Sequence, residues 1–228
     1  MTGLDVTETA LSSIKNLIIT HQYKPGDRLL ETALAKELSL SRTPVRDALA
    51  RLESVGFLEK QKGHRGYWIP LLTPKEMKSV FSIRGLLEGH AARIAAQKRT
   101  EEDIQYLREL NEEEIKAFYD GRKEDYSQIN ELFHFTINTI ADDIYLRRFF
   151  EQIFWRSKLY DFFFAGFYNF KNSYKDEKDK RLSYKEHKMI IDVIERQDAD
   201  ESEKMMRFHM KEAYKHLLNG GFDVDFGL

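Results

Sequence analysis

Apolar residues recur at every third or fourth position along most of the chain, and this spacing predicts amphipathic helices. The first pattern covers residues 6–18 and ends before Pro25-Gly26-Asp27, which is a strong turn signal. A short helix is predicted over residues 31–38 and a longer one over residues 42–55. The break Ser39-Leu40-Ser41 separates them, so these two helices are expected to form a helix-turn-helix unit.

Two strand-like runs follow the third helix, over residues 57–60 and 67–70. They flank residues 61–66, a basic segment with glycines that suits the tip of a hairpin. Two short helices followed by a basic hairpin are the layout of a winged helix-turn-helix.

From Thr73 onward the pattern is helical, without strand alternation or an internal repeat. Thr73-Pro74-Lys75-Glu76 is a capping box with proline at the first helical position, so a helix is predicted to start there. The helices predicted in this half cover residues 74–97, 100–119, 123–140, 143–165, 178–197 and 200–218. Helices of this length with short connections predict an antiparallel bundle.

The predicted fold class is therefore mainly α, with two domains. Residues 1–72 are expected to form the winged helix-turn-helix and residues 73–220 an all-helical antiparallel bundle. Residues 221–228 are expected to form a tail.

The composition excludes several classes of site. The chain of 228 residues has no cysteine, which excludes disulfides, thiolate zinc sites and cysteine nucleophiles. A metal ion would have to be bound by histidine, carboxylate or amide groups. The apolar runs are too short for a membrane span and the N-terminal residues do not resemble a signal peptide, so we expect a soluble cytoplasmic protein with no membrane partner.

The net charge of −2 averages two unlike halves. Residues 1–72 contain 10 basic and 8 acidic side chains, whereas the remaining residues contain 26 and 30. The basic excess is concentrated between residues 41 and 66, in the predicted second helix of the helix-turn-helix and the hairpin. The overall charge therefore does not argue against binding to nucleic acid.

The start of the third predicted helix has the chemistry that reads a DNA major groove. Arg42 and Arg46 share one helix face, and arginine can contact guanine O6 and N7 with two hydrogen bonds. Hydroxyl groups and free first-turn amides suit phosphate oxygens. The alternative is that these arginines only make an exposed face soluble. The predicted DNA-binding residues are Ser41, Arg42, Thr43, Pro44, Arg46, Arg51, Lys62, Gly63 and Arg65.

Residues 31–58 resemble the DNA-binding domain of the GntR family, and the segment Ser41-Arg42-Thr43-Pro44-Val45-Arg46 is highly specific for it. The resemblance implies a homodimer that binds double-stranded operator DNA at a short inverted repeat. It also implies major-groove contacts from residues 42–46 and minor-groove contacts from the hairpin tip around Lys62 and Gly63.

Three histidines in the predicted bundle could converge. His187 and His209 are each eleven residues from Asp198, which lies in a predicted turn, so they would lie at similar heights in a helical hairpin. His134 follows Asn130 by four residues on one helix face. Spacing alone leaves open whether these are metal ligands or ordinary core histidines.

The bundle looks like the FCD type of effector-binding and dimerisation domain, in the FadR subfamily of GntR proteins. The resemblance rests on residues 83–96, on Asn130 with His134, and on Glu186-His187 and His209. It implies a divalent metal ion, either zinc, nickel or manganese, bound by Asn130, His134, His187 and His209. Metal-binding members of that group have either aspartate or asparagine at this position. The asparagine present here, Asn130, brings no negative charge.

Arg84 is a candidate for binding a small carboxylate effector, because guanidinium and carboxylate groups pair through two hydrogen bonds. The family pattern implies the same role. The alternative is an ion pair with Glu88 or Glu131. Arg156 and Tyr160, one helical turn apart, are further effector-binding candidates.

The leading interpretation is a DNA-binding transcriptional regulator, in particular a repressor, that senses a small organic acid, through a bound metal ion or without one. One alternative is a metal-dependent enzyme with an accessory DNA-binding domain, since three histidines with open positions can activate water. No His-Glu-x-x-His motif or nucleophile elbow supports it. Another alternative is a DNA-binding dimer that responds to no ligand.

Overall fold

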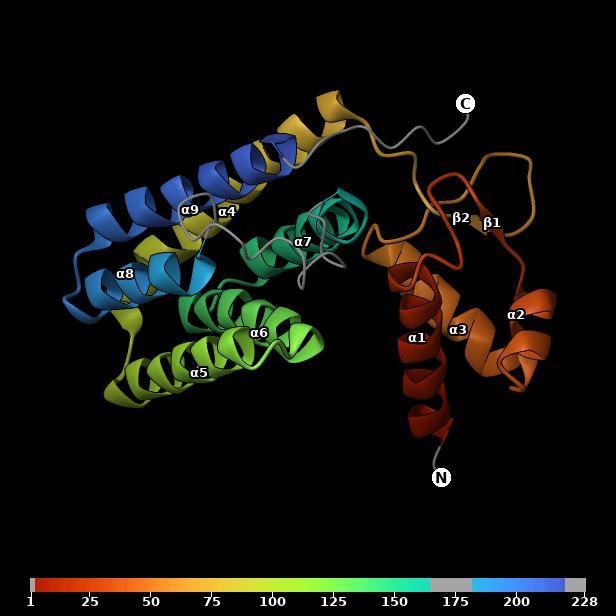
Figure 1. Ribbon diagram of the computed structural model, residues 1–228, viewed down its shortest axis with the longest axis horizontal. Helices are drawn as coiled ribbons and strands as arrows, with labels where there is room; N and C mark the ends of the chain where they lie inside the picture. The colour runs from red at the N-terminus through yellow and green to blue at the C-terminus, as the bar shows by residue number, and fades with distance from the viewer. Residues whose placement is uncertain (1–2, 165–181, 220–228) are drawn as a thin grey trace.

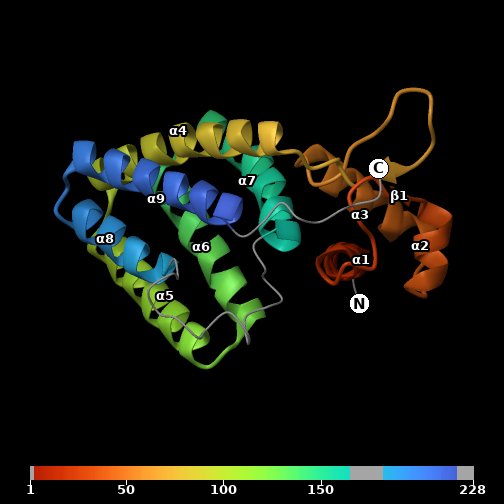
Figure 2. The same ribbon diagram turned by 45° about the horizontal axis from the view of Figure 1, so that its top comes forward.

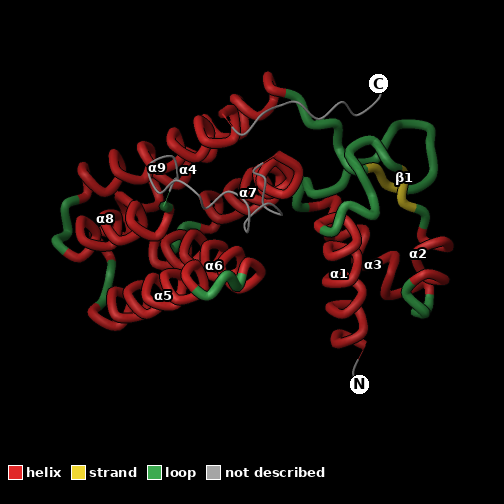
Figure 3. The backbone as a smooth tube through the Cα atoms, viewed as in Figure 1, coloured by secondary structure: helices red, strands yellow, loops and turns green. Residues whose placement is uncertain are grey.

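The computed structural model describes residues 3–164 and 182–219, which form a winged helix domain and a helical bundle joined end to end (Figure 1). The winged helix domain comprises residues 3–72, and the helical bundle comprises the described residues from 74 onward. The predicted tail, 221–228, lies outside the described residues. The mainly helical fold class is confirmed, and Figure 3 shows how little of the described chain is strand.

The winged helix domain folds around the apolar faces of its three helices. Ile14, Leu34 and Leu49, one from each helix, are fully buried in the same cluster, as their spacing predicts. The elements of this domain are α1 Gly3–Ile19, β1 Arg28–Leu29, α2 Glu31–Glu37, α3 Arg42–Ser54 and β2 Tyr67–Trp68.

The small sheet differs from the sequence prediction. β1 pairs antiparallel with β2, and the predicted strand 57–60 contributes a single bridge, from Glu59 to Trp68. Phe57 and Leu58 form no strand because their backbone amides both donate to the Leu52 carbonyl at the end of α3, at 2.9 and 3.2 Å. Their side chains are buried in the core instead. The prediction of a strand over residues 57–60 was therefore wrong in extent, and β1 was missed.

The bundle consists of six described helices. Five of them match their predicted ranges to within a few residues. The fifth predicted range, residues 178–197, is the exception: residues 178–181 lie outside the described residues, Leu182 is not helical, and the described helix starts at Ser183. The helices are α4 Pro74–Lys98, α5 Glu101–Tyr119, α6 Lys123–Ala141, α7 Ile144–Phe164, α8 Ser183–Glu195 and α9 Ala199–Asn219.

Capping side chains set two of these helix starts. Thr100 and Asp103 form a complete capping box at the start of α5. At the start of α4 the Thr73 hydroxyl accepts from the Glu76 amide at 3.2 Å, but the Glu76 carboxylate pairs with Arg156 of α7. Only half of the capping box predicted at residues 73–76 therefore forms.

Helices α4 and α9 lie side by side along the length of the bundle, as Figures 1 and 2 both show. They run antiparallel, since Gly85 lies near Met210 and Gly89 near Arg207 and Glu203. Glycines at an i, i+4 spacing let the two backbones approach closely. In this arrangement α9 lies beside α8, and the inward side chains of α9 meet those of α6 and α8.

Helix α7 of the bundle packs against the winged helix domain. Its C-terminal residues belong to the same apolar cluster as the core of the winged helix domain. The Phe57 and Trp155 rings meet edge to face at 6.0 Å, and the Lys15 ammonium lies 3.5 Å from the centre of the Trp155 ring. No helix of the described residues is long and apolar enough to cross a membrane.

Candidate nucleic-acid interface and metal centre

The first turn of α3 presents an exposed basic face. Ser41, Arg42, Thr43 and Arg46 are all exposed, while the Val45 side chain is buried beneath them. Arg42 approaches Glu31 at 3.8 Å and Arg46 approaches Asp47 at 3.4 Å. Ion pairs this exposed contribute little, so both guanidinium groups can exchange these partners for DNA.

Two residues of the predicted DNA-binding set have other contacts. Pro44 is buried in the first turn of α3. Backbone amides of the first turn make no hydrogen bond within the helix, so proline, which lacks an N–H, is tolerated there. Arg51 is exposed, but its guanidinium pairs with Glu8 of α1. Pro44 therefore packs within the winged helix domain, whereas a DNA contact from Arg51 stays a prediction.

The hairpin tip is exposed and held at its base. Lys62, Gly63 and Arg65 are all exposed, as a groove-binding tip requires. The Arg28 guanidinium donates to the Arg65 carbonyl at 2.7 Å. Gly66 has φ +103°, and a Cβ there would lie 2.8 Å from the Leu29 carbonyl oxygen, so only glycine fits where the hairpin crosses β1.

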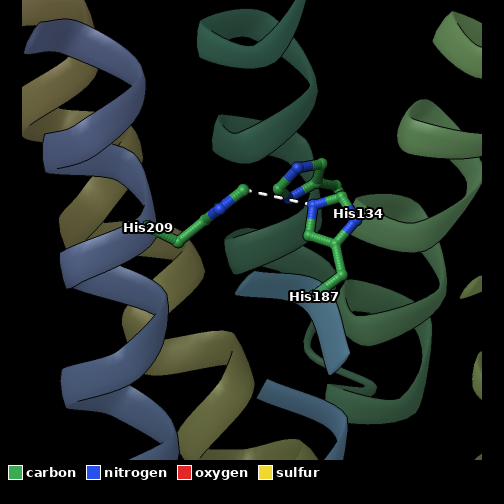
Figure 4. Close-up of side chains that lie close together, drawn as sticks. All are labelled: His134, His187 and His209. Carbon is green, nitrogen blue, oxygen red and sulfur yellow. Dashed lines mark hydrogen bonds between the residues drawn. The ribbon is translucent and has the colours of Figure 1, made fainter. Parts of the chain in front are cut away.

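The three predicted histidines converge inside the bundle. His134 of α6, His187 of α8 and His209 of α9 are 1%, 0% and 2% exposed. One ring nitrogen from each lies within 4.8 Å of the others, and Figure 4 shows the three rings close together. The equal heights of His187 and His209 are confirmed, since their Nε2 atoms are 3.3 Å apart.

Each of the three rings is oriented by a glutamate from a different helix. A carboxylate only accepts hydrogen bonds, so the Nδ1 atom beside it carries the proton and the Nε2 atom keeps its lone pair. The lone pairs of His187 and His209 thus face each other at the centre of the cluster. The pairs are His134 with Glu88, His187 with Glu114 at 2.7 Å, and His209 with Glu186 at 2.6 Å.

His134 and its partner Glu88 are in the charge states that a metal-binding histidine requires. Burial lowers the pKa of His134 to about 3, against the opposing effect of Glu88. Burial alone would raise the pKa of Glu88, but the Arg84 and His134 groups outweigh it and lower the pKa to about 2. The contact is therefore a hydrogen bond from a neutral imidazole to a carboxylate, and a neutral imidazole is the form that binds metal ions.

Glu114 belongs to this cluster and was not among the predicted site residues. The residue follows Leu107 and Leu110 and precedes Ala117 on the buried face of α5. An acidic residue within an apolar stripe was the available signal, because a buried carboxylate requires a polar partner. Asn130 lies one helical turn before His134 and is half-buried, and its place among the ligands stays a prediction.

The predicted effector-binding residues already have partners within the protein. Arg84 is 4% exposed, pairs with Glu88, donates to Ser157 Oγ at 2.9 Å and lies over the Phe154 ring. The ion pair with Glu88, considered above as the alternative, is thus present. Effector contacts from Arg84 stay a prediction.

Arg156 and Tyr160 meet on one carboxylate. Arg156 Nε donates to Glu76 Oε1 at 2.8 Å, and the Tyr160 hydroxyl donates to Glu76 Oε2. Arg156 also borders an open, mainly apolar groove of about 490 Å³ between the two domains. The groove is lined by Gly56, Leu58, Glu59, Ile83, Leu87, Phe149, Gln152, Ile153 and Arg156.

Comparison with known proteins assigns the two domains. Residues 6–67 match the family model "Bacterial regulatory proteins, gntR family", and residues 79–212 match the FCD domain model. The chain is 27% identical to the uncharacterized HTH-type transcriptional regulator YdhC of Bacillus subtilis, over 92% of this chain and 91% of that protein. It is 26% identical to the Nta operon transcriptional regulator of Aminobacter aminovorans, over 89% and 90% of the two chains.

A solved structure shares the fold. Escherichia coli McbR/YncC aligns with a TM-score of 0.74 at 23% sequence identity, over 94% of this chain and 97% of that chain. The exposed helix-turn-helix face, the helical bundle and the two family matches agree with one another. The chain belongs to the GntR family of bacterial regulatory proteins, with a C-terminal FCD domain, and is a DNA-binding transcriptional regulator.

Proposed function

We propose that this regulator is a homodimeric repressor that senses a small carboxylate through a divalent metal ion in its FCD domain. One observation carries the proposal: three buried imidazoles, each oriented by a carboxylate, bring one ring nitrogen each to within 4.8 Å of the others. Each imidazole has one nitrogen bonded to a glutamate, and ring nitrogens of the three gather in one place. That arrangement fits a metal ion better than it fits packing.

Zinc or nickel suits this site better than manganese, because imidazole nitrogen favours the former and manganese favours oxygen. His134, His187 and His209 would bind the ion, and Asn130 could add an amide oxygen. A bound divalent ion supplies a Lewis acid whose remaining positions accept water or a carboxylate. The role is sensing rather than catalysis, and the curated relatives named above are transcriptional regulators.

The exposed face of α3 supports direct readout of an operator. One α3 helix reaches only a few base pairs, so a homodimer on an inverted repeat would supply two such helices one helical turn apart. Effector binding would act by changing the distance between them. Since α7 contacts both domains, it is the helix through which the FCD domain would act.

Selection of bound duplexes from random DNA should return an inverted repeat. Arg46→Ala should then lose about 1–3 kcal/mol of affinity and relax specificity at one position of each half-site. Lys116→Ala, at an exposed basic position of α5 in the bundle, is the control, and it should leave the operator affinity unchanged. Equal losses in the two variants would contradict the assigned reading face.

Metal binding is tested by elemental analysis and by thermal shift with Zn²⁺, Ni²⁺ and Mn²⁺. The unmutated protein should gain stability from a bound ion, and the double variant His134→Ala, His187→Ala should not. The same double variant should still bind operator DNA. If the unmutated protein binds none of these ions under any loading condition, the proposed metal site is wrong. The proposed binding to operator DNA would be unaffected by that result.

A further inference from the structure

Glu114 of α5 is a buried carboxylate without a lysine or arginine beside it. It is 1% exposed, and its partners among the described residues are His187 Nδ1 at 2.7 Å and the Ser183 hydroxyl at 3.2 Å. No lysine or arginine in the described part of the chain lies within ion-pair distance of it. A buried carboxylate without an opposite charge is strongly unfavourable, so the position requires a source of positive charge.

The other two glutamates of the cluster differ from Glu114 in this respect. Glu88 is fully buried, but Arg84 pairs with it directly. Glu186 has a side chain that is 14% exposed, so solvent reaches it. Glu114 therefore depends most on a charge that enters through its histidine.

A cation on the far side of the His187 ring can supply that charge. Nδ1 of His187 donates to Glu114, and Nε2 faces His209 Nε2 at 3.3 Å. Two lone pairs at this distance repel each other unless a proton or a metal ion lies between them. A divalent cation on the Nε2 side polarises the imidazole and strengthens its Nδ1–H bond to the carboxylate.

Hydrogen bonds fix the carboxylate itself. Ser183 begins α8 and donates to Glu114 Oε1, and the Ser183 hydroxyl also contacts the Tyr126 hydroxyl of α6. Glu114 is thereby held between three helices, α5, α6 and α8. The His187 ring stacks on Phe133 at 3.9 Å between centroids, which limits its rotation.

Resting on the proposed metal site, we infer that Glu114 is a positioning residue of that site, which orients His187 and supplies the negative charge that Asn130 does not. The divalent ion is thus held by three histidines and by the charge of a carboxylate that does not touch it. Affinity then depends more on Glu114 than on the side chain at position 130.

The test is the affinity for Zn²⁺ alone, measured by competition with a chromophoric chelator. Glu114→Gln keeps an oxygen that accepts from Nδ1 but removes the charge, and should weaken Zn²⁺ binding by about 10- to 100-fold. Glu112→Gln, exposed on the same helix, should change nothing. Asn130→Ala should cost less than Glu114→Gln.

A second readout separates positioning from a purely structural role. The metal-free Glu114→Gln protein should melt no lower than the metal-free unmutated protein, because it no longer buries a charge. A melting temperature that falls while the Zn²⁺ affinity holds would overturn the inference. So would equal Zn²⁺ affinities in the Glu114→Gln and Glu112→Gln variants.

Failure of this inference is distinguishable from failure of the proposed function. If the unmutated protein binds Zn²⁺ and Glu114→Gln binds it equally well, the metal site stands and the role of Glu114 falls. If the unmutated protein binds no ion, both fall. If Glu114→Gln does not fold, Ser183→Ala decides, since it removes one hydrogen bond to the carboxylate: a several-fold loss of affinity supports the inference and an unchanged affinity overturns it.

Discussion

Lys158 of α7 is a buried ammonium with three N–H donors and one hydrogen-bond acceptor, Ser127 Oγ at 3.0 Å. No carboxylate of the described residues lies within ion-pair distance of it. Burial lowers the pKa of Lys158 from 10.5, against the pull of Asp161 and Glu131. Its Nζ atom also lies 5.3 Å from the centre of the Phe162 ring, so Lys158 is a charged group in the core with one hydrogen bond and one aromatic contact.

Replacing Lys158 with methionine should raise the free energy of unfolding at pH 7 by about 1–2 kcal/mol, because it removes a buried charge and keeps the volume. In the unmutated protein the folded state releases the proton at a lower pH than the unfolded state does. Stability therefore rises as the pH increases from the folded pKa towards 10.5, and the advantage of the variant should shrink there. Urea unfolding at pH 7 and at pH 10 measures this.

Lys211→Met, at an exposed position of α9, is the control for the loss of a lysine, and it should change little at either pH. A Lys158→Met protein that is less stable at pH 7 would mean that the ammonium has a favourable partner in the core.

At the scale of helices, α4 and α9 approach closely at two glycines with different surroundings. A Cβ at Gly85 would lie 3.5 Å from Met210 Cβ, which is ordinary contact, but at Gly89 it would lie 2.8 Å from Arg207 Cγ. Gly85→Ala should therefore keep most of the helix-propensity gain of about 0.5–1 kcal/mol. Gly89→Ala should lose that gain to the clash.

Thermal unfolding of the two variants measures the difference, and each serves as the control for the other because both sit inside α4. Gly85→Ala should melt higher than Gly89→Ala. Equal melting temperatures would mean that the Arg207 side chain moves aside at no cost.

Helices were the most predictable feature at this scale, and small tertiary pairings the least. Hydrophobic periodicity predicted the boundaries of α4 to α7 closely. Counting residues from the turn at Asp198 predicted that His187 and His209 lie at the same height in the helical hairpin. The two residues of β1 have no local pattern, since they pair only because β2 passes beside them. The Glu114 contact was missed for a similar reason: spacing within α5 cannot show which histidine of α8 lies opposite.

At the scale of the whole molecule, the two domains share one core instead of being joined by a free linker. The Trp155 ring of α7 touches both: it contacts Phe57 edge to face and lies under the Lys15 ammonium of α1. Beside it, Gln152 donates to the Ser54 carbonyl at 3.4 Å. A conformational change within the bundle can therefore reach α1 and α3 through the packed side chains of α7. The same helix carries Ser157, the hydrogen-bond partner of Arg84.

Trp155→Ala should uncouple the domains, because truncating a large aromatic at a packed site costs about 3 kcal/mol or more. By calorimetry the unmutated protein should unfold in one transition, and the variant should show a separate, earlier transition of the winged helix domain. Added Zn²⁺ should then raise only the later transition, because the ion would bind the bundle alone. Phe149→Ala, at a 56% exposed aromatic of the same helix, should keep a single transition. If Trp155→Ala also unfolds in one transition that Zn²⁺ raises as a whole, the coupling lies elsewhere in the shared core and α7 is not its carrier.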